Sequence, residues 1–292
     1  MDVRAAVELL WPGRAATWEV LGEGLTRHNV KVTLDDGDVL VVRLADAATE
    51  ALGIDRRVEH EACLAAAAVG VGPDVEAFIE PCGPLVTRWV RGESLHARDL
   101  RRPDVLRRVA TSLRAFHGGP PLPRRFDSFR VVEELRSAAF ALGAEIPPAY
   151  AWARQVARRV ADARGAVPER PCHNDLACAN LIDDRSRIRI VDWEVAGMGD
   201  VLFDLACLAV DAGLDPDERR VLLEAYGRFP RPRGERALEL MRFMVCFRDA
   251  LWGIVQGAVS ASGYDHDAYA AARFAALEAI VEEPAFTAAL DG

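Results

Sequence analysis

The sequence predicts an α+β fold in which a small β-rich N-terminal lobe precedes a larger, mainly helical C-terminal lobe. Short runs of β-forming residues fill the first third of the 292-residue chain. After Gly92, apolar residues recur every three or four positions, which is the periodicity of helices packed on a core. We therefore predict two closely packed domains, residues 1–92 and residues 93–292.

Five strands and one helix are predicted in the N-terminal lobe. The helix, Asp55–Val69, ends because Gly70 and then Pro73 do not continue it. An Asp-Asp-Gly-Asp turn at 35–38 is typical of a hairpin and joins two of the strands. The predicted strands are Trp18–Leu25, Asn29–Thr33, Val39–Leu44, Val75–Ile79 and Leu85–Val90.

Helices dominate the predicted C-terminal lobe. The clearest is Pro103–His117, whose apolar residues line one helical face, and a segment rich in glycine and proline ends it. One short apolar strand, Ile188–Val191, interrupts the pattern, and from Asp200 onward the chain is again mostly helical. Two further helices are predicted, at Arg130–Leu142 and Pro148–Arg164.

Composition and charge limit the classes of function. The net charge of −9 argues against nucleic acid as a partner, because binding to phosphates needs an excess of basic residues. The N-terminus has no signal-peptide pattern, and the most apolar stretches, 62–71 and 201–212, are too short to cross a bilayer. The six cysteines include no CxxC pair and predict neither a zinc site nor a disulfide framework. We expect a cytoplasmic protein without membrane insertion, whose cysteines are reduced.

The most specific pattern is His173-Asn-Asp175 followed by Asn180, and then by Asp192 after a short apolar strand. Phosphoryl transfer needs a carboxylate that accepts the proton of the attacking hydroxyl and hard oxygen ligands that hold Mg²⁺. We predict Asp175 as the catalytic base and Asn180 and Asp192 as metal ligands. Each residue alone is equally typical of a surface turn. The spacing of the three, with apolar runs between them, favours the catalytic interpretation.

This segment resembles the aminoglycoside phosphotransferase and choline kinase superfamily, a protein-kinase-like branch with the signature His-x-Asp-x-x-x-x-Asn and a later Asp. The sequence from Asp192, Asp-Trp-Glu-Val-Ala-Gly and then Phe-Asp-Leu-Ala at 203–206, looks like the bacterial choline/ethanolamine kinase-like group. The resemblance extends from Leu21 to Tyr269. It implies a bilobal protein-kinase-like fold, ATP and Mg²⁺ as cofactors, and a small cationic molecule as the hydroxyl acceptor.

The resemblance also implies a nucleotide site in the N-terminal lobe. Segment 21–29 lies where related kinases fold a loop over the phosphates, and Thr26 and Asn29 are its polar candidates. Arg43 falls where the family often has a cation for the α- and β-phosphates, although an arginine-rich protein also has arginines there without such a role. Glu59 matches the family's Arg-x-x-Glu pattern and is the expected partner of Arg43.

On the acceptor side, the resemblance points to residues that hold a cation with aromatic faces and carboxylates. Trp252 and Tyr269 match aromatic residues of the family's cage, and Asp211 matches an acid near the cation. Glu194 belongs to the Asp-Trp-Glu motif. Asp249 lies one turn before Trp252, where eukaryotic choline kinases have a second tryptophan.

Two departures weaken the match to a choline cage. Asp249 replaces an aromatic residue, and Val195 replaces the tyrosine that usually follows Glu194. The site is therefore more acidic than a choline cage, and a primary amine, an amino alcohol or a polyhydroxylated amine fits at least as well. Trp252 and Tyr269 are equally consistent with core packing, and Arg248 with a structural ion pair.

The sequence as a whole predicts an ATP- and Mg²⁺-dependent kinase that phosphorylates a hydroxyl of a small amino alcohol such as choline or ethanolamine. One alternative is a kinase of the same fold that acts on an aminoglycoside or another natural product. A nucleotide-binding pseudokinase is the other, although Asp175, Asn180 and Asp192 are all present. A hydrolase is not indicated, because the chain has neither a Gly-x-Ser-x-Gly nor an HExxH motif. No feature indicates an oligomeric state.

Overall fold

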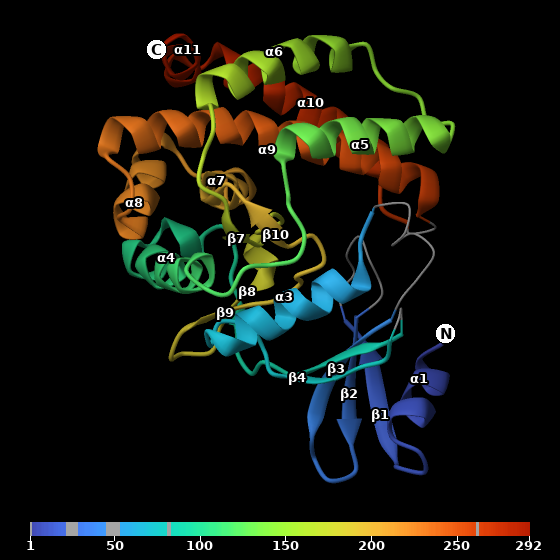
Figure 1. The fold of residues 1–292 in the computed structure, drawn as a ribbon. Coiled ribbons are helices and arrows are strands. Elements are labelled where there is room, and N and C mark those ends of the chain that lie inside the picture. The colour runs from blue at the N-terminus through green and yellow to red at the C-terminus, as the bar shows by residue number, and fades with distance from the viewer. Residues whose placement is uncertain (1, 22–28, 45–52, 81–82, 261–262) are drawn as a thin grey trace.

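The computed structural model describes residues 2–21, 29–44, 53–80, 83–260 and 263–292. Its N-terminal part is a sheet flanked by two helices, and its C-terminal part is a stack of helices crossed by the long helix α9 (Figure 1). The predicted α+β organisation, a small β-rich part before a larger helical part, is confirmed. The boundary at residue 92 stays a prediction.

Five antiparallel strands form the N-terminal sheet in the order β1-β2-β3-β5-β4. The predicted hairpin turn joins β2 to β3, and in it Gly37 has φ 89°, a conformation that glycine adopts without steric cost. β1 begins two residues before the predicted strand and ends at Val20. The strands are β1 (Ala16–Val20), β2 (Asn29–Leu34), β3 (Val39–Arg43), β4 (Val75–Phe78) and β5 (Leu85–Arg88).

The alternation of side chains along these strands decides which residues face the rest of the protein. Val30 and Val42 point into a small core that includes Ala6 and Val7 of the unpredicted helix α1 (Val3–Leu10). Because successive side chains point to opposite faces of a strand, Arg43 belongs to the other face of the sheet. On that face, the Arg43 side chain lines a cavity between the sheet and the helical part.

The connection from the sheet to the helical part requires a glycine. Helix α3 (Arg56–Ala68), capped by Asp55, packs against β4, and β5 leads into β6 (Glu93–Ser94), which pairs with β8. A Cβ atom at Gly92 would lie 2.5 Å from the carbonyl oxygen of Asp183 in β8. Only glycine therefore lets the connection approach β8 this closely.

The helical part is organised around α9, a helix of 29 residues whose side chains are buried along most of its length. Helices α5, α7 and α10 pack directly against it. The helix predicted at Pro103–His117 has those bounds in the structure. The helices are α4 (Pro103–His117), α5 (Ser128–Ala141), α6 (Ala149–Arg164), α7 (Val201–Asp211), α8 (Pro216–Tyr226), α9 (Arg231–Val259), α10 (His266–Glu282) and α11 (Pro284–Asp291).

Two small sheets lie between the N-terminal sheet and the helices. β7 (Arg170–Cys172) pairs with β10 (Gly197–Gly199), and β8 (Leu181–Asp183) forms a hairpin with β9 (Ile188–Ile190). The segment between β7 and β8, which includes the 3₁₀ turn η2 (Cys178–Asn180), carries the sequence motif. The motif is thus a loop held between two short strands.

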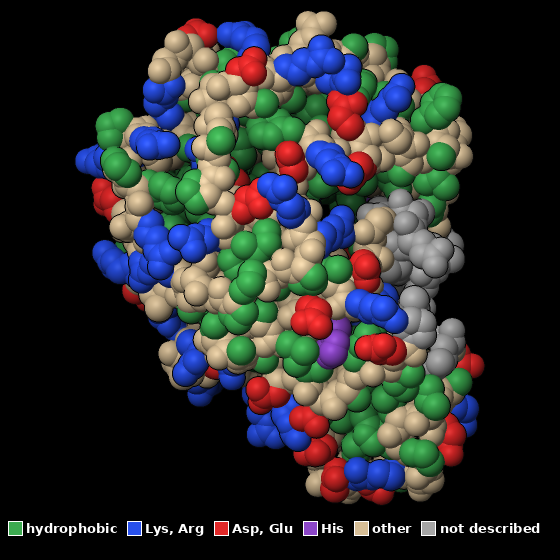
Figure 2. Space-filling model, in the orientation of Figure 1, with side chains coloured by type: hydrophobic (Ala, Val, Ile, Leu, Met, Phe, Trp, Pro, Cys, Tyr) green, Lys and Arg blue, Asp and Glu red, His purple; other side chains and the backbone are tan. Residues whose placement is uncertain are grey.

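Basic and acidic side chains are interspersed over the face that Figure 2 shows, so the net negative charge does not gather there in one patch. Within the described ranges, no helix is both long and apolar enough to cross a bilayer.

Candidate active site

A cavity of about 720 Å³ lies between the N-terminal sheet and the helical part. It brings together side chains from strands, the motif loop and the four helices α3, α7, α9 and α10. Thr26 lies outside the described residues. The other predicted site residues all line the cavity: Asn29, Arg43, Glu59, Asp175, Asn180, Asp192, Glu194, Asp211, Asp249, Trp252 and Tyr269.

Hydrogen bonds within the motif loop fix the position of Asp175. The backbone N–H of Asp175 donates to Nδ1 of His173 (3.2 Å), and Nε2 of the same ring donates to the carbonyl of Val191 (2.9 Å). One buried histidine therefore links the loop to the segment that carries Asp192. Asn174 and Asp192 both have positive φ, 66° and 70°, which non-glycine residues adopt at a cost and which is concentrated at functional sites.

Behind the loop, the fully buried Asp204 of α7 accepts the backbone N–H groups of His173 (2.8 Å) and Asn174 (2.6 Å). His117, at the end of α4, donates from Nε2 to the same carboxylate (3.0 Å) and accepts the hydroxyl of Tyr226 at Nδ1 (2.9 Å). Burial disfavours the ionised carboxylate of Asp204, but these hydrogen bonds outweigh it and lower its pKa. The carboxylate thus anchors the start of the loop.

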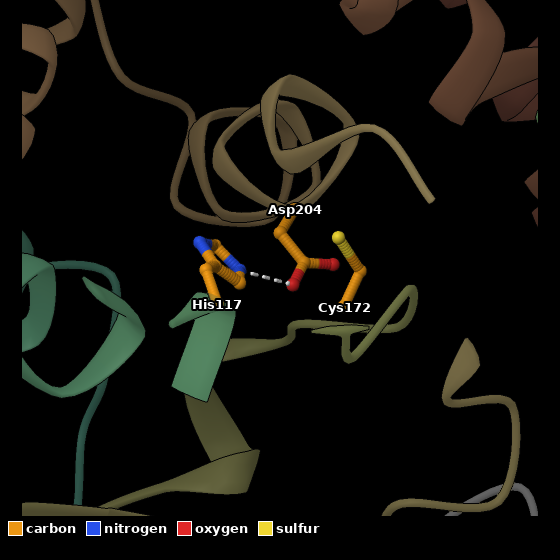
Figure 3. Close-up of side chains that lie close together, drawn as sticks. All are labelled: His117, Cys172 and Asp204. Atoms are coloured by element: carbon orange, nitrogen blue, oxygen red, sulfur yellow. Dashed lines mark hydrogen bonds and ion pairs between the residues drawn. The ribbon is translucent and has the colours of Figure 1, made fainter. Parts of the chain in front are cut away.

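The same cluster has the spacing of a metal site but not its chemistry. Ligand atoms of His117, Cys172 and Asp204 lie within 4.8 Å of one another (Figure 3). Both oxygens of Asp204 already accept hydrogen bonds, however, and burial raises the pKa of the Cys172 thiol, which keeps its proton. These donors form a hydrogen-bonded support rather than a set of free ligands.

Asn180 and Asp192 lie side by side because of the β8–β9 hairpin. Leu181 pairs with Ile190, and the N–H of Val191 donates to the carbonyl of Asn180 (3.0 Å). The amide nitrogen of the Asn180 side chain donates to the carbonyl of Asp175 (3.1 Å), which leaves its oxygen as an acceptor. One amide oxygen and one carboxylate are hard ligands of the kind that Mg²⁺ prefers, so this donor set fits the ion.

Arg43 is the centre of what we call the β3 wall, formed by Arg43, Arg56, Glu59, Asp192 and Glu194. Its guanidinium contacts three carboxylates: Glu59 (Nε to Oε1, 3.0 Å), Asp192 and Glu194. Arg56 also binds Glu59. Burial raises the pKa of Glu59, and the two arginines oppose that shift. Asn29 lies beside Arg43, because the two residues pair across β2 and β3.

The opposite side, the α9 wall, consists of Asp175, Asp211, Arg248, Asp249, Trp252, Tyr269 and Arg273. Arg248 pairs with Asp175 (Nη2 to Oδ1, 3.0 Å) and with Asp249 (Nε to Oδ1, 2.7 Å). Burial raises the pKa of Asp175, and the charge of Arg248 opposes this shift. Asp211 accepts the N–H of Cys178 (2.7 Å) and pairs with no basic side chain among the described residues.

The aromatic residues of the α9 wall pack edge to face. The rings of Trp252 and Tyr269 lie 6.1 Å apart at 73°. Gly253 permits this approach of α10 to α9, because a Cβ atom there would lie 3.0 Å from the Tyr269 ring. The guanidinium of Arg273 lies over the face of Tyr269, 4.9 Å from the ring centroid, and 3.6 Å from Asp249. Part of the predicted cage is thus covered by the protein's own cation.

Two arginines of this wall, Arg248 and Arg273, were not among the predicted site residues, although Arg248 was considered for a structural ion pair. A signal for Arg248 was available: Arg248 and Asp249 interrupt the apolar run 243–255, and charged residues are seldom buried unless they are paired. For Arg273 the sequence has no comparable signal, since its contacts with Asp249 and Tyr269 depend on how α10 packs on α9.

Comparisons with known proteins find matches over most of the chain. Residues 17–240 match the model of the phosphotransferase enzyme family. The crystal structure of a choline/ethanolamine kinase family protein from Mesorhizobium loti superposes with a TM-score of 0.83 at 30% identity, covering 98% of this chain and 97% of that one.

Two curated relatives are similar over most of their length. Protein LicA from Haemophilus influenzae is 27% identical over 274 residues, which is 89% of this chain and 78% of that protein. Ethanolamine kinase 1 from Mus musculus is 24% identical over 307 residues, which is 90% of this chain and 84% of that protein. The predicted resemblance and the protein-kinase-like fold are confirmed.

Proposed function

The chain belongs to the phosphotransferase enzyme family, in its choline/ethanolamine kinase branch, and we propose that it transfers the γ-phosphate of ATP to the hydroxyl of a small amino alcohol such as choline or ethanolamine. It is a small-molecule kinase. ATP and Mg²⁺ as its cofactors, and the amino alcohol as its acceptor, are the proposed part.

The observation that carries the proposal is that a single cavity holds Asp175, Asn180 and Asp192 together with the aromatic and acidic α9 wall. The residues proposed as base, as metal ligands and as a surface for a cationic acceptor thus line one cavity. A phosphoryl transfer is catalysed mainly by positioning and by charge stabilisation, which this arrangement supports.

In the proposed reaction, Asp175 orients the acceptor hydroxyl and accepts its proton while the oxygen attacks the γ-phosphorus. The bond between that phosphorus and the β,γ-bridging oxygen breaks, and ADP leaves. Arg43 and the backbone of the N-terminal sheet hold the phosphates. Mg²⁺ held by Asn180 and Asp192 would neutralise charge on the phosphate oxygens.

The α9 wall favours a small protonated amine. Asp211 contacts no basic side chain within the described part of the chain, and its carboxylate suits an ammonium group. Because the Arg273 guanidinium lies over the ring of Tyr269, less aromatic surface is left for a trimethylammonium group. The cavity volume of about 720 Å³ is that of a pocket for one drug-sized ligand. The preference for a small amino alcohol therefore rests on the charge and the aromatic surface of this wall.

A panel of acceptors tests this proposal. ADP release is measured with ATP and Mg²⁺ and with ethanolamine, its N-methylated derivatives up to choline, or an aminoglycoside. Ethylamine and 1-propanol are matched controls, since the first lacks the hydroxyl and the second the amine. We expect acceptor-dependent ADP release with at least one amino alcohol and none with either control. Turnover of the aminoglycoside alone would move the protein to the natural-product kinases, and no acceptor-dependent turnover would remove the proposal.

A further inference from the structure

We propose that Arg248 is a positioning residue that holds the carboxylate of Asp175 in place for the acceptor hydroxyl, and that Asp249 is the counter-ion of Arg248 rather than a ligand of the acceptor. This inference rests on the proposed function, in which Asp175 is the base. It assigns Arg248 a role and changes the predicted role of Asp249.

Arg248 contacts the motif loop at two adjacent residues. Its Nη1 donates to the backbone carbonyl of Asn174 (2.9 Å), and its Nη2 lies 3.0 Å from Oδ1 of Asp175. Asn174 is the loop residue with φ 66°. The planar guanidinium therefore fixes both the backbone before the base and the side chain of the base, which a single-point cation cannot do.

The surroundings of Arg248 hold it rigidly. Its side chain is 7% exposed, whereas that of Asp175 is 47% exposed at the cavity. It extends from α9, which is buried along most of its length, and its guanidinium lies 5.6 Å from the ring centroid of Phe203. A half-exposed carboxylate is thus tied to a buried cation, an arrangement that helps to keep a reacting group in its productive geometry.

Asp249 has the position of a counter-ion. Its two oxygens face two arginines, Oδ1 at 2.7 Å from Nε of Arg248 and Oδ2 at 3.6 Å from Nε of Arg273. Its side chain is 12% exposed. A buried arginine needs such a partner, and a carboxylate whose negative charge already faces two guanidinium groups attracts an acceptor amine less than a carboxylate without a basic partner does. Asp211, which has no basic partner among the described residues, is available for that role.

The experiment compares Arg248→Met, Arg248→Lys and Asp249→Asn with Arg242→Met as the matched control. Arg242 is a buried arginine of the same helix that pairs with Glu239 and Glu283, outside the cavity. For each variant we would measure kcat, the KM of ATP and of the acceptor found in the panel, and thermal unfolding. Arg248→Met and Arg242→Met each remove a buried ion pair, so both should lose stability. A loss of kcat in Arg248→Met alone would therefore report an effect on the base.

We expect Arg248→Met to lower kcat by about 10²-fold, the cost of a base displaced by about 1 Å, with both KM values changed by less than about threefold. Arg248→Lys should recover part of kcat, because an ammonium reaches Asp175 but not Asn174 as well. Asp249→Asn should lower kcat more than it raises the acceptor KM. Arg242→Met should lower the unfolding temperature and leave kcat near that of the wild type.

Three results would overturn the inference: an unchanged kcat in Arg248→Met, an equal loss of kcat in Arg242→Met, or a large rise in acceptor KM with unchanged kcat in Asp249→Asn. If Arg248→Met does not fold, Arg248→Lys decides, since an unchanged kcat in that variant contradicts the need for a fork of donors. A wild-type protein without activity on any acceptor would instead refute the proposed function.

Discussion

The β3 wall and the α9 wall each place three carboxylates against two guanidinium groups, but they pair them differently. On the β3 wall, Glu59, Asp192 and Glu194 all contact Arg43. On the α9 wall, two carboxylates contact Arg248 and the third, Asp211, has no basic partner among the described residues. The excess negative charge is shared around one cation on the first wall and localised on one carboxylate on the second.

This difference matches the ligands proposed for the two walls. Carboxylates gathered around one arginine can be redistributed when a divalent ion and phosphates bind, since Arg43 then has phosphate oxygens to contact. A single unpaired carboxylate suits a single ammonium group. The comparison also separates two arginines that are both buried. In the proposed reaction Arg43 holds the phosphates, whereas Arg248 is proposed to position the base.

The largest expected effect comes from Asp192, which connects the β3 wall to the proposed metal. Asp192→Asn removes a charged ligand, and metal stabilisation of the transition state is worth several kcal/mol, so kcat should fall by about 10³-fold. Titration of activity with Mg²⁺ should also shift to higher concentrations. The control is Asp184→Asn. Asp184 lies in the β8–β9 turn and does not line the cavity of the candidate site, so this variant should keep the wild-type activity. An unaltered Mg²⁺ dependence in Asp192→Asn would separate Asp192 from the metal.

A smaller and more selective effect is expected on the α9 wall. Asp211→Asn should raise the KM of the acceptor by about 10- to 100-fold, the value of a hydrogen bond to a charged group, and leave the KM of ATP unchanged. Steady-state kinetics with each substrate varied in turn measures both values. An unchanged acceptor KM in Asp211→Asn would mean that this carboxylate does not bind the amine. The difference in charge pairing between the two walls would then not explain which ligand each wall binds.

The smallest effect concerns the support behind the α9 wall and depends on pH. The pKa of Asp204 is lowered from 3.8, so its stabilising contribution is present above that pH and is lost as the pH falls toward the folded-state pKa. Asp204→Asn should cost about 1–3 kcal/mol of unfolding free energy at pH 7. Urea unfolding at pH 7 and below pH 4 measures the difference in unfolding free energy between wild type and variant, which should be smaller at the lower pH. A constant gap would mean that the carboxylate charge is not what anchors the loop.

Local signals in the sequence were enough for much of the fold. Pro103–His117 was predicted with its observed bounds, because a proline begins the helix and a run of glycine and proline ends it. The strand predicted at Trp18–Leu25 differs from β1 at its start, since β1 begins at Ala16, and residues 22–25 of the prediction lie outside the described ranges. Helix α1 was not predicted. It has only eight residues, and its apolar face is buried by packing against the sheet, a contact that the local sequence does not indicate.

The candidate site shows more clearly that local sequence signals do not predict tertiary contacts. Spacing alone indicated Asp175, Asn180 and Asp192, because one loop and one hairpin set their positions. Contacts between distant elements did not follow from spacing. The sequence suggested Asp249 as a partner for the acceptor, whereas in the structure two arginines face its oxygens, one of them reaching across from α10.

The most direct test of the account is product formation by the wild type and by Asp175→Asn, followed by ³¹P NMR with ATP, Mg²⁺ and the preferred amino alcohol. The account predicts a phosphomonoester signal that depends on the acceptor hydroxyl. It also predicts a rate about 10²- to 10⁴-fold lower in Asp175→Asn, the contribution of a general base, with nucleotide affinity retained. An equal rate in the variant, or inorganic phosphate as the sole product of the wild type, would contradict it.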